Sequence, residues 1–145
     1  MSLCLKTPLK VIEDGRGRLM EMLRNDEHGF TGFGQVYMTT CNPNIVKAWH
    51  LHKYQTDQFV CVSGTLKVGI YDWDLGLTET YYIGENSPYR ITIPPNLWHG
   101  FMACGTKEAV VINTVDKPFN YANPDEYRRP FDDKKIPYEW AIKSF

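Results

Sequence analysis

Two histidines separated by a single residue, His50 and His52, stand out in a segment whose other residues are typical of β-strands. Residues two apart in a strand point to the same face. Both imidazoles are therefore expected on one side of a sheet, with Trp49 and Leu51 on the other. Because imidazole titrates near neutral pH, the pair could exchange protons with a substrate, bind a metal ion, or serve as polar residues on a partly solvated strand.

A metal site would include two further residues as ligands, Asp57 and His99. Three imidazoles and one carboxylate form a ligand set that suits Fe(II), Mn, Ni or Zn. Such a centre, made of His50, His52, Asp57 and His99, would favour dioxygenase or metal-dependent isomerase chemistry. The acid–base interpretation requires no metal and no other cofactor.

The elements that must position these residues are short strands. Runs rich in Val, Ile, Tyr, Phe and Thr alternate with clusters of Gly, Pro, Asn and Asp, without a long amphipathic helical period. This pattern predicts an all-β double-sheet jelly roll or barrel, followed by a tail that mixes a helical turn at 124–129 with irregular chain. The expected strands lie within residues 9–23 (two strands around a turn), 32–41, 46–52, 58–64, 65–73, 79–85, 90–95, 98–104 and 108–115.

The composition narrows the class of protein. The 145 residues fit a single domain spanning 1–145, and 43% are hydrophobic and 14% aromatic, as in a globular β-rich protein. The formal charge of -1 and the lack of a long basic run disfavour nucleic acid as a partner. No apolar run is long enough to cross a membrane, and the first residues do not form a secretory signal. The four cysteines form no CxxC pair, which favours reduced thiols and a cytoplasmic location.

Two segments resemble the motifs of the cupin superfamily. The spacing of His50, His52, Asp57 and Gly64 is similar to the first motif, in which Glu usually stands at the position of Asp57. The segment 93–101, Ile-Pro-Pro-Asn-Leu-Trp-His-Gly-Phe, is similar to the second motif, which lies on adjoining strands. The resemblance implies a cupin-type double-stranded β-helix.

A second resemblance, to the dTDP-4-dehydrorhamnose 3,5-epimerases, covers nearly the whole chain. Segment 13–23 is similar to their Asp-x-Arg-Gly-x-Leu/Phe-x-Glu stretch, and segment 34–40 is similar to their Gln-x-Asn strand, with Tyr37 in place of Asn. Segment 46–50 is similar to their Val/Leu-Arg-Gly-Leu-His stretch, and segment 93–101 is similar to their Pro-Pro-Gly-Phe-Ala-His-Gly-Phe stretch. The tail resembles their Tyr-x-Pro-x-x-Glu segment and their Asp-Pro-x-Leu-x-Ile-x-Trp ending.

This resemblance implies roles for individual residues. His50 matches the general base of the family, and Asp133, seven residues before Trp140, matches the carboxylate that orients the base. The residues expected to contact a nucleotide-diphosphate sugar are Arg16, Gln35, Lys47 and His99.

The centre of the chain departs from the epimerase pattern. The catalytic tyrosine of the family falls at or near Ile112, which has no proton to give, and its active-site lysine falls at Asp57. Segment 50–68 instead resembles the dTDP-sugar 3,4-ketoisomerases, in which both histidines take part in proton transfer without a metal. The proton donor is then expected, in this order, to be His52, Tyr37 or Tyr121.

We therefore predict an epimerase that acts beside the ketone of a nucleotide-linked 4-keto-6-deoxy sugar through an enolate, and that forms a homodimer. The alternatives are a 3,4-ketoisomerase, a metal-dependent cupin enzyme, and a cupin that binds a sugar without turnover. Four of the site residues also have structural interpretations. Asp133 could be a solvated loop acid, Arg16 a hairpin surface charge and Lys47 an edge-strand lysine, and His99 could serve the geometry of its strand.

Overall fold

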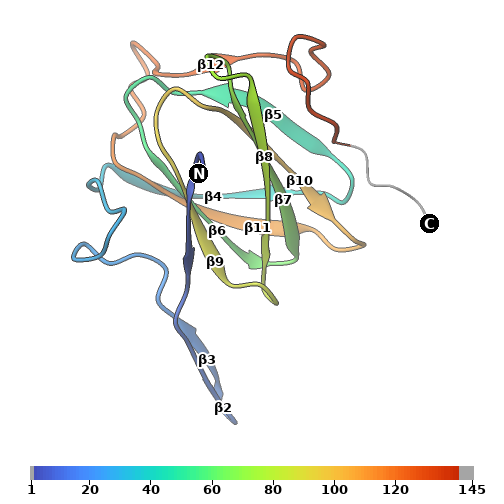
Figure 1. Ribbon diagram of the computed structural model, residues 1–145. Helices are drawn as coiled ribbons and strands as arrows, with labels where there is room; N and C mark the ends of the chain where they lie inside the picture. Colours follow the sequence, from blue (N-terminus) through green and yellow to red (C-terminus); the bar gives the residue numbers. More distant parts are fainter. Residues whose placement is uncertain (1, 141–145) are drawn as a thin grey trace.

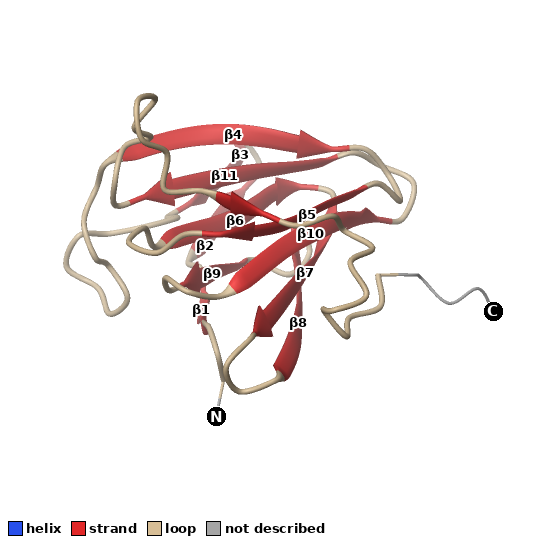
Figure 2. Ribbon diagram, turned by 90° about the horizontal axis from the view of Figure 1, so that it is seen from above, coloured by secondary structure: helices blue, strands red, loops and turns tan. Residues whose placement is uncertain are grey.

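The strands form two five-stranded antiparallel sheets that pack face to face in the computed structural model, which describes residues 2–140 (Figure 1 and Figure 2). The first sheet has the order β1 (Leu5–Pro8), β9 (Tyr89–Ile93), β6 (Asp57–Ser63), β11 (Ala109–Val115) and β4 (Gln35–Cys41). The second has the order β12 (Tyr127–Arg128), β5 (Val46–Leu51), β10 (Trp98–Cys104), β7 (Thr65–Asp72) and β8 (Leu77–Gly84).

The predicted double-sheet jelly roll is confirmed, and each predicted segment overlaps the expected strand or strands. The sequence pattern does not predict β1, a four-residue edge strand that contains Lys6 and Pro8. The helical turn predicted at 124–129 is wrong, because β12 lies there and extends the second sheet by pairing with β5. Residues 141–145 of the tail lie outside the described residues.

Between residues 2 and 140 the chain has no helix with the length and apolar character that crossing a membrane requires. The thiols are free in this part of the chain, in agreement with the prediction from their spacing; Cys4, Cys41 and Cys61 are buried and Cys104 is half-buried. The cytoplasmic location stays a prediction.

Apolar side chains from both sheets fill the space between them. Leu66, Val68 and Ile70 of β7 point inward, in the alternation expected of a strand that faces a core. Burying one such aliphatic side chain stabilises the fold by about 1.5–3 kcal/mol. The core reaches Phe59 and Phe101, whose rings pack edge to face with centroids 5.8 Å apart. The polar site described below begins where this apolar core ends.

A second apolar cluster lies on the outer face of the second sheet. The tail residues Ile136 and Trp140 pack there against Trp49 of β5. Trp140 and Tyr138 approach Gly69 so closely that a Cβ atom at this position would lie 2.7 Å from the Trp140 ring. Because the tail covers this face, β5, β10 and β7 are enclosed on both sides. The strands that carry His50 and His99 are therefore packed on both faces.

Strands β2 (Val11–Asp14) and β3 (Gly17–Met20) form the predicted hairpin, which projects from the body of the sandwich (Figure 1). Its apolar residues Ile12 and Leu19 are exposed. An exposed apolar hairpin is typical of a surface that another chain covers.

Candidate active site

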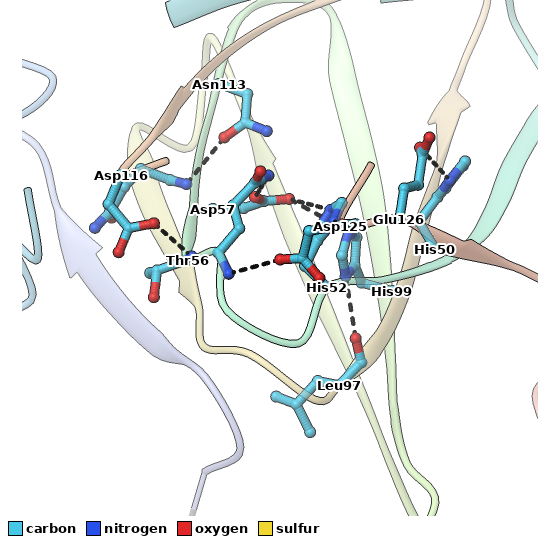
Figure 3. A network of polar contacts seen from close by, with 12 residues as sticks. His50, His52, Thr56, Asp57, Leu97, His99, Asn113, Asp116, Asp125 and Glu126 are labelled. Carbon is cyan, nitrogen blue, oxygen red and sulfur yellow. Dashed lines mark hydrogen bonds and ion pairs between the residues drawn. The ribbon is translucent and has the colours of Figure 1, made fainter. Parts of the chain in front are cut away.

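Three histidines meet at one end of the sandwich because two strands of the second sheet bring them together. His50 lies opposite His99 in the pairing of β5 with β10, and the His52 and His99 rings lie 5.2 Å apart between centroids (Figure 3). Trp49 and Leu51 belong to the cluster on the other face of the sheet. The prediction that His50 and His52 share one face is therefore confirmed.

Glu126 is the carboxylate in contact with His50. Its Oε1 atom lies 3.3 Å from Nδ1 of His50, a buried nitrogen for which the described residues offer no well-aligned hydrogen bond (Figure 3). Burial, together with the neighbouring His99, lowers the pKa of His50, and the charge of Glu126 opposes this shift. The imidazole is therefore neutral at pH 7, and a neutral imidazole can accept a proton.

His52 and His99 both direct a ring nitrogen at Asp57. The Nε2 atoms of His52 and His99 lie 3.5 Å and 3.3 Å from Oδ2 of Asp57. On the other side of each ring, Nδ1 of His52 donates to the carbonyl oxygen of Asp125 (2.6 Å), and Nδ1 of His99 donates to that of Leu97 (3.2 Å). A carbonyl oxygen can only accept, so the proton of each neutral ring is on Nδ1 and Nε2 has a free lone pair.

Nε2 of His52, Nε2 of His99 and Oδ2 of Asp57 thus face one another, each with a lone pair. A proton or a cation between them is needed to offset their mutual repulsion. Burial by itself would raise the pKa of Asp57, but hydrogen bonds from the two imidazoles outweigh this and lower it far below its usual range. Burial by itself would lower the pKa of His52, but the hydrogen bond and charge of Asp57, together with Asp125, outweigh this and raise it. Without a metal, the raised pKa of His52 favours an extra proton on this ring, which then donates to Asp57.

The same three residues fit a divalent metal ion. One ligand atom from each of His52, Asp57 and His99 lies within 4.8 Å of the others. Two imidazoles and a carboxylate are ligands that Zn, Fe and Mn accept. The backbone carbonyls that accept from Nδ1 would fix the orientation of both rings. His50 faces Glu126 and is not part of this group, in contrast to the four-residue set expected from the sequence.

Asp125 fixes the loop that leads from the histidines to Asp57. Its carboxylate accepts hydrogen bonds from three successive backbone N–H groups, those of Lys53, Tyr54 and Gln55, at 2.8, 2.9 and 3.1 Å. These bonds lower its pKa in spite of partial burial. The side-chain amide of Gln55 in turn donates to Asp57. Asp125 and Glu126, which are adjacent in sequence, therefore hold His52 and His50, respectively.

Tyr37 and Asn113 enter the site from the first sheet. They lie opposite each other in the pairing of β4 with β11, and the Asn113 amide donates to the Tyr37 hydroxyl (2.8 Å). Burial and the negative charge of Asp57 raise the pKa of Tyr37 to about 12, so its hydroxyl keeps its proton at neutral pH. Ile112, the position counted for the family tyrosine, alternates with the buried Asn113 and points to the other face.

Two adjoining cavities open onto this set of residues. The smaller, of about 210 Å³, is lined by His50, His52, His99 and Asp57 together with Lys47 and Tyr37. The larger, of about 370 Å³, lies next to it, and Tyr37, His52 and Glu126 line both. The described residues therefore offer one pocket rich in titratable groups and a second one continuous with it.

Three further residues expected from the sequence line these cavities. Lys47 borders the smaller one, and its ammonium donates to the carbonyl oxygen of Thr40 (2.6 Å). Gln35 and Tyr121 border the larger one. Tyr121 is 86% exposed and packs edge to face on Phe119, and it therefore lies at the rim.

Two other expected residues lie elsewhere. Asp133 accepts a hydrogen bond from Arg129 (3.1 Å) and one from the backbone of Lys135, and does not line the cavity that contains His50. Arg16 lies in the turn of the β2–β3 hairpin, where its 89% exposed side chain pairs with Asp14. Arg16 and the histidines are therefore not brought together within one chain.

From the sequence we predicted no role for Glu126, Asp125 or Asn113. The first two follow an Asn-Pro pair in the tail, and tandem acids after such a turn are a weak signal of a fixed loop. Asn113 lies in a run of mainly β-branched residues, where a buried amide is unusual enough to mark a site.

We compared the chain with known protein families, proteins and structures. Residues 12–127 match the family model described as the polysaccharide biosynthesis C-terminal domain. A protein described as a probable low-salt glycan biosynthesis epimerase, Agl13 of Haloferax volcanii, is 40% identical over 139 residues, which cover 91% of this chain and 89% of that protein.

Solved structures of sugar isomerases and epimerases are similar to this chain. A dTDP sugar isomerase from Desulfovibrio desulfuricans G20 superposes with a TM-score of 0.90 at 31% identity, covering 97% of this chain and 92% of that one. The dTDP-4-dehydrorhamnose 3,5-epimerase of Elizabethkingia anophelis NUHP1 shares the fold, with a TM-score of 0.78 at 20% identity, over 97% of this chain and 82% of that one. The chain therefore belongs to the polysaccharide biosynthesis C-terminal domain family, and it has the jelly-roll fold of the epimerase-like cupins.

Proposed function

We propose that this protein is an epimerase that inverts a carbon next to the ketone of a nucleotide-linked 4-keto-6-deoxy sugar. The observation that carries the proposal is a neutral imidazole, His50, held by Glu126 at the wall of a cavity that is large enough for a hexose ring. Proton abstraction beside a carbonyl requires such a base in reach of the carbon. The relatives named as a glycan biosynthesis epimerase and a dTDP sugar isomerase support the same class of reaction.

In this reaction His50 takes the proton through Nε2, since Nδ1 faces Glu126. The carboxylate stabilises the imidazolium that forms, as in other His–carboxylate pairs. The electrons of the C–H bond pass into an enolate, whose oxygen needs nearby positive charge. Lys47 lines the same cavity and supplies such a charge.

The second cavity suits the nucleotide part of the substrate. It continues from the first past His52 and Glu126, and it is lined by two cationic side chains, Lys117 and Arg128. These can bind a diphosphate through charge-assisted hydrogen bonds. The aromatic pair at its rim, Phe119 and Tyr121, can cover a base ring.

A homodimer is part of this proposal. The edge strand β4 exposes Val36 and Met38, which are 52% and 62% exposed, and the hairpin exposes further apolar residues. Pairing of two copies would cover these surfaces. It would also allow Arg16 of one copy to contact the substrate of the other, which the geometry of a single chain does not allow.

Two other functions remain as alternatives, each with its own support. In a 3,4-ketoisomerase, His50 and His52 would move a proton between neighbouring carbons; both line the smaller cavity, as such a relay requires. In a metal-dependent enzyme, His52, Asp57 and His99 would hold the ion. The metal would supply Lewis-acid polarisation of the ketone oxygen, and His50 would still remove the proton.

The test is incubation of the purified protein with dTDP-4-keto-6-deoxyglucose in deuterated water, followed by NMR. The proposal expects deuterium at C3 or C5 and a new epimer with the ketone still at C4. A ketone that moves to C3 would support the isomerase, and binding without any exchange would support a sugar-binding cupin. Activity that vanishes with a chelator and returns with a metal would support the metal-dependent form.

A further inference from the structure

Asn113 is held in one orientation by two neighbouring strands. It is fully buried in β11, and its Oδ1 atom accepts the backbone N–H of Gln58 in β6 (3.0 Å). A backbone N–H can only donate, so the oxygen of the amide must face Gln58. The NH2 group is thereby directed to the opposite side, toward Tyr37 of β4 (2.8 Å).

This orientation determines the direction of the Tyr37 hydroxyl. The hydroxyl oxygen accepts from Asn113, and its own hydrogen is therefore not used in that contact. Tyr37 lines both cavities, which are the space that this hydrogen can reach. The neighbours of Tyr37 in sequence, Val36 and Met38, point to the outer face of β4.

Tyr37 also approaches the sugar cavity from the side opposite the base. His50 belongs to the second sheet and Tyr37 to the first, and both line the cavity of about 210 Å³. The other candidates for the donor are less well placed. Both ring nitrogens of His52 are engaged by Asp125 and Asp57, and Tyr121 lies at the exposed rim of the second cavity.

We propose that Asn113 is a positioning residue that fixes the hydroxyl of Tyr37, so that Tyr37 delivers a proton to the face of the substrate opposite His50. The inference rests on the proposed epimerase function and names the residues that turn proton abstraction into inversion.

The protons balance in this scheme. His50 takes the proton from the carbon beside the ketone, and the C–H electrons form the enolate. Tyr37 gives its O–H proton to the same carbon from the other side, and the ketone forms again. The tyrosine is left as a phenolate, which the Asn113 amide stabilises as a donor. Solvent then returns one proton to Tyr37 and takes one from His50.

The experiment compares exchange with inversion at the same carbon, with the 4-keto-6-deoxy sugar nucleotide in deuterated water. In Tyr37→Phe the base still works, so the unreacted substrate is expected to gain deuterium with its configuration retained. Inversion is expected to fall by at least about 100-fold, the usual contribution of a general acid, while exchange falls by less than about tenfold. Tyr82→Phe, an exposed tyrosine on β8, is the matched control and is expected to behave as wild type.

Asn113→Ser keeps a small polar side chain but removes the group that reaches the tyrosine. It is expected to show the same excess of exchange over inversion, in a milder form. If Asn113 acts through Tyr37, the double variant should lose no more inversion than Tyr37→Phe alone. Thermal unfolding of each variant monitors the fold, and Tyr37→Phe tests the tyrosine even if Asn113→Ser does not fold.

The outcomes separate the two proposals. If wild type shows neither exchange nor inversion, the epimerase function itself fails. If wild type inverts its substrate and Tyr37→Phe does so equally well, or loses exchange and inversion together, Tyr37 is not the donor. If Tyr37→Phe loses inversion and a folded Asn113→Ser keeps it, the positioning role of Asn113 is refuted.

Discussion

Glu126→Gln tests whether the carboxylate beside His50 supports proton abstraction. The substitution keeps the size of the side chain and removes its charge. At the observed separation of 3.3 Å, the attraction between the carboxylate and an imidazolium is about 1.3 kcal/mol in a water-like dielectric of 80 and about 5 kcal/mol at an effective dielectric of 20. Both side chains are about a quarter exposed, so we expect a value between these limits, about 2–3 kcal/mol. This corresponds to a fall in kcat of about 30- to 150-fold.

The assay is the initial rate of epimer formation at saturating substrate, with KM measured in parallel. We expect KM to change little, since the imidazolium forms only as the proton is removed. Glu108→Gln, at an exposed position directly before β11, is the matched control and should leave kcat unchanged. A kcat for Glu126→Gln within threefold of wild type would refute the reasoning, because the charge would then have no part in the step.

Three further predictions concern stability and assembly. Gly69→Ala places a methyl group 2.7 Å from the Trp140 ring, and a loss of about 1–3 kcal/mol in the free energy of unfolding by urea is expected; an unchanged midpoint would contradict the packing of the tail. Asp125→Asn weakens a carboxylate that accepts three backbone N–H groups and has a lowered pKa, and we expect a loss of about 1–2 kcal/mol at pH 7. The wild-type advantage should be present above pH 4 and shrink as the pH falls below the unfolded value of about 3.9; an advantage that is independent of pH would exclude the charge as its source. The double variant Val36→Asp, Met38→Asp should be a monomer in light scattering, and a persistent dimer would place the interface away from the edge of β4.

Much of the fold can be predicted from the sequence because its strands are short, β-branched and separated by turn residues. The common face of His50 and His52 follows from the period of a strand alone. His99 joins them because β10 pairs with β5, a pairing that the two-motif pattern implies. These parts depend on local periodicity, which a single sequence contains.

The rest of the site depends on tertiary placement. Glu126 reaches His50 because β12, which follows it, pairs with β5. This pairing involves only two residues of β12, too few to leave a pattern in the sequence. Asp133, expected there by its distance from Trp140, instead pairs with Arg129. A shift of one residue along a strand reverses the side on which a side chain lies. Counting along the chain from His99 placed the position of the family tyrosine at Ile112 and therefore missed the buried amide of Asn113, the next residue.

The central claim is that His50 removes a proton from carbon. The most direct measurement is the rate of solvent deuterium entry into a dTDP-4-keto-6-deoxy sugar, compared among wild type, His50→Asn and the loop variant His28→Asn. We predict deuterium entry at one carbon beside the ketone for wild type and His28→Asn, and a loss of at least about 100-fold in this rate for His50→Asn. Deuterium entry at the wild-type rate in a folded His50→Asn protein would contradict it.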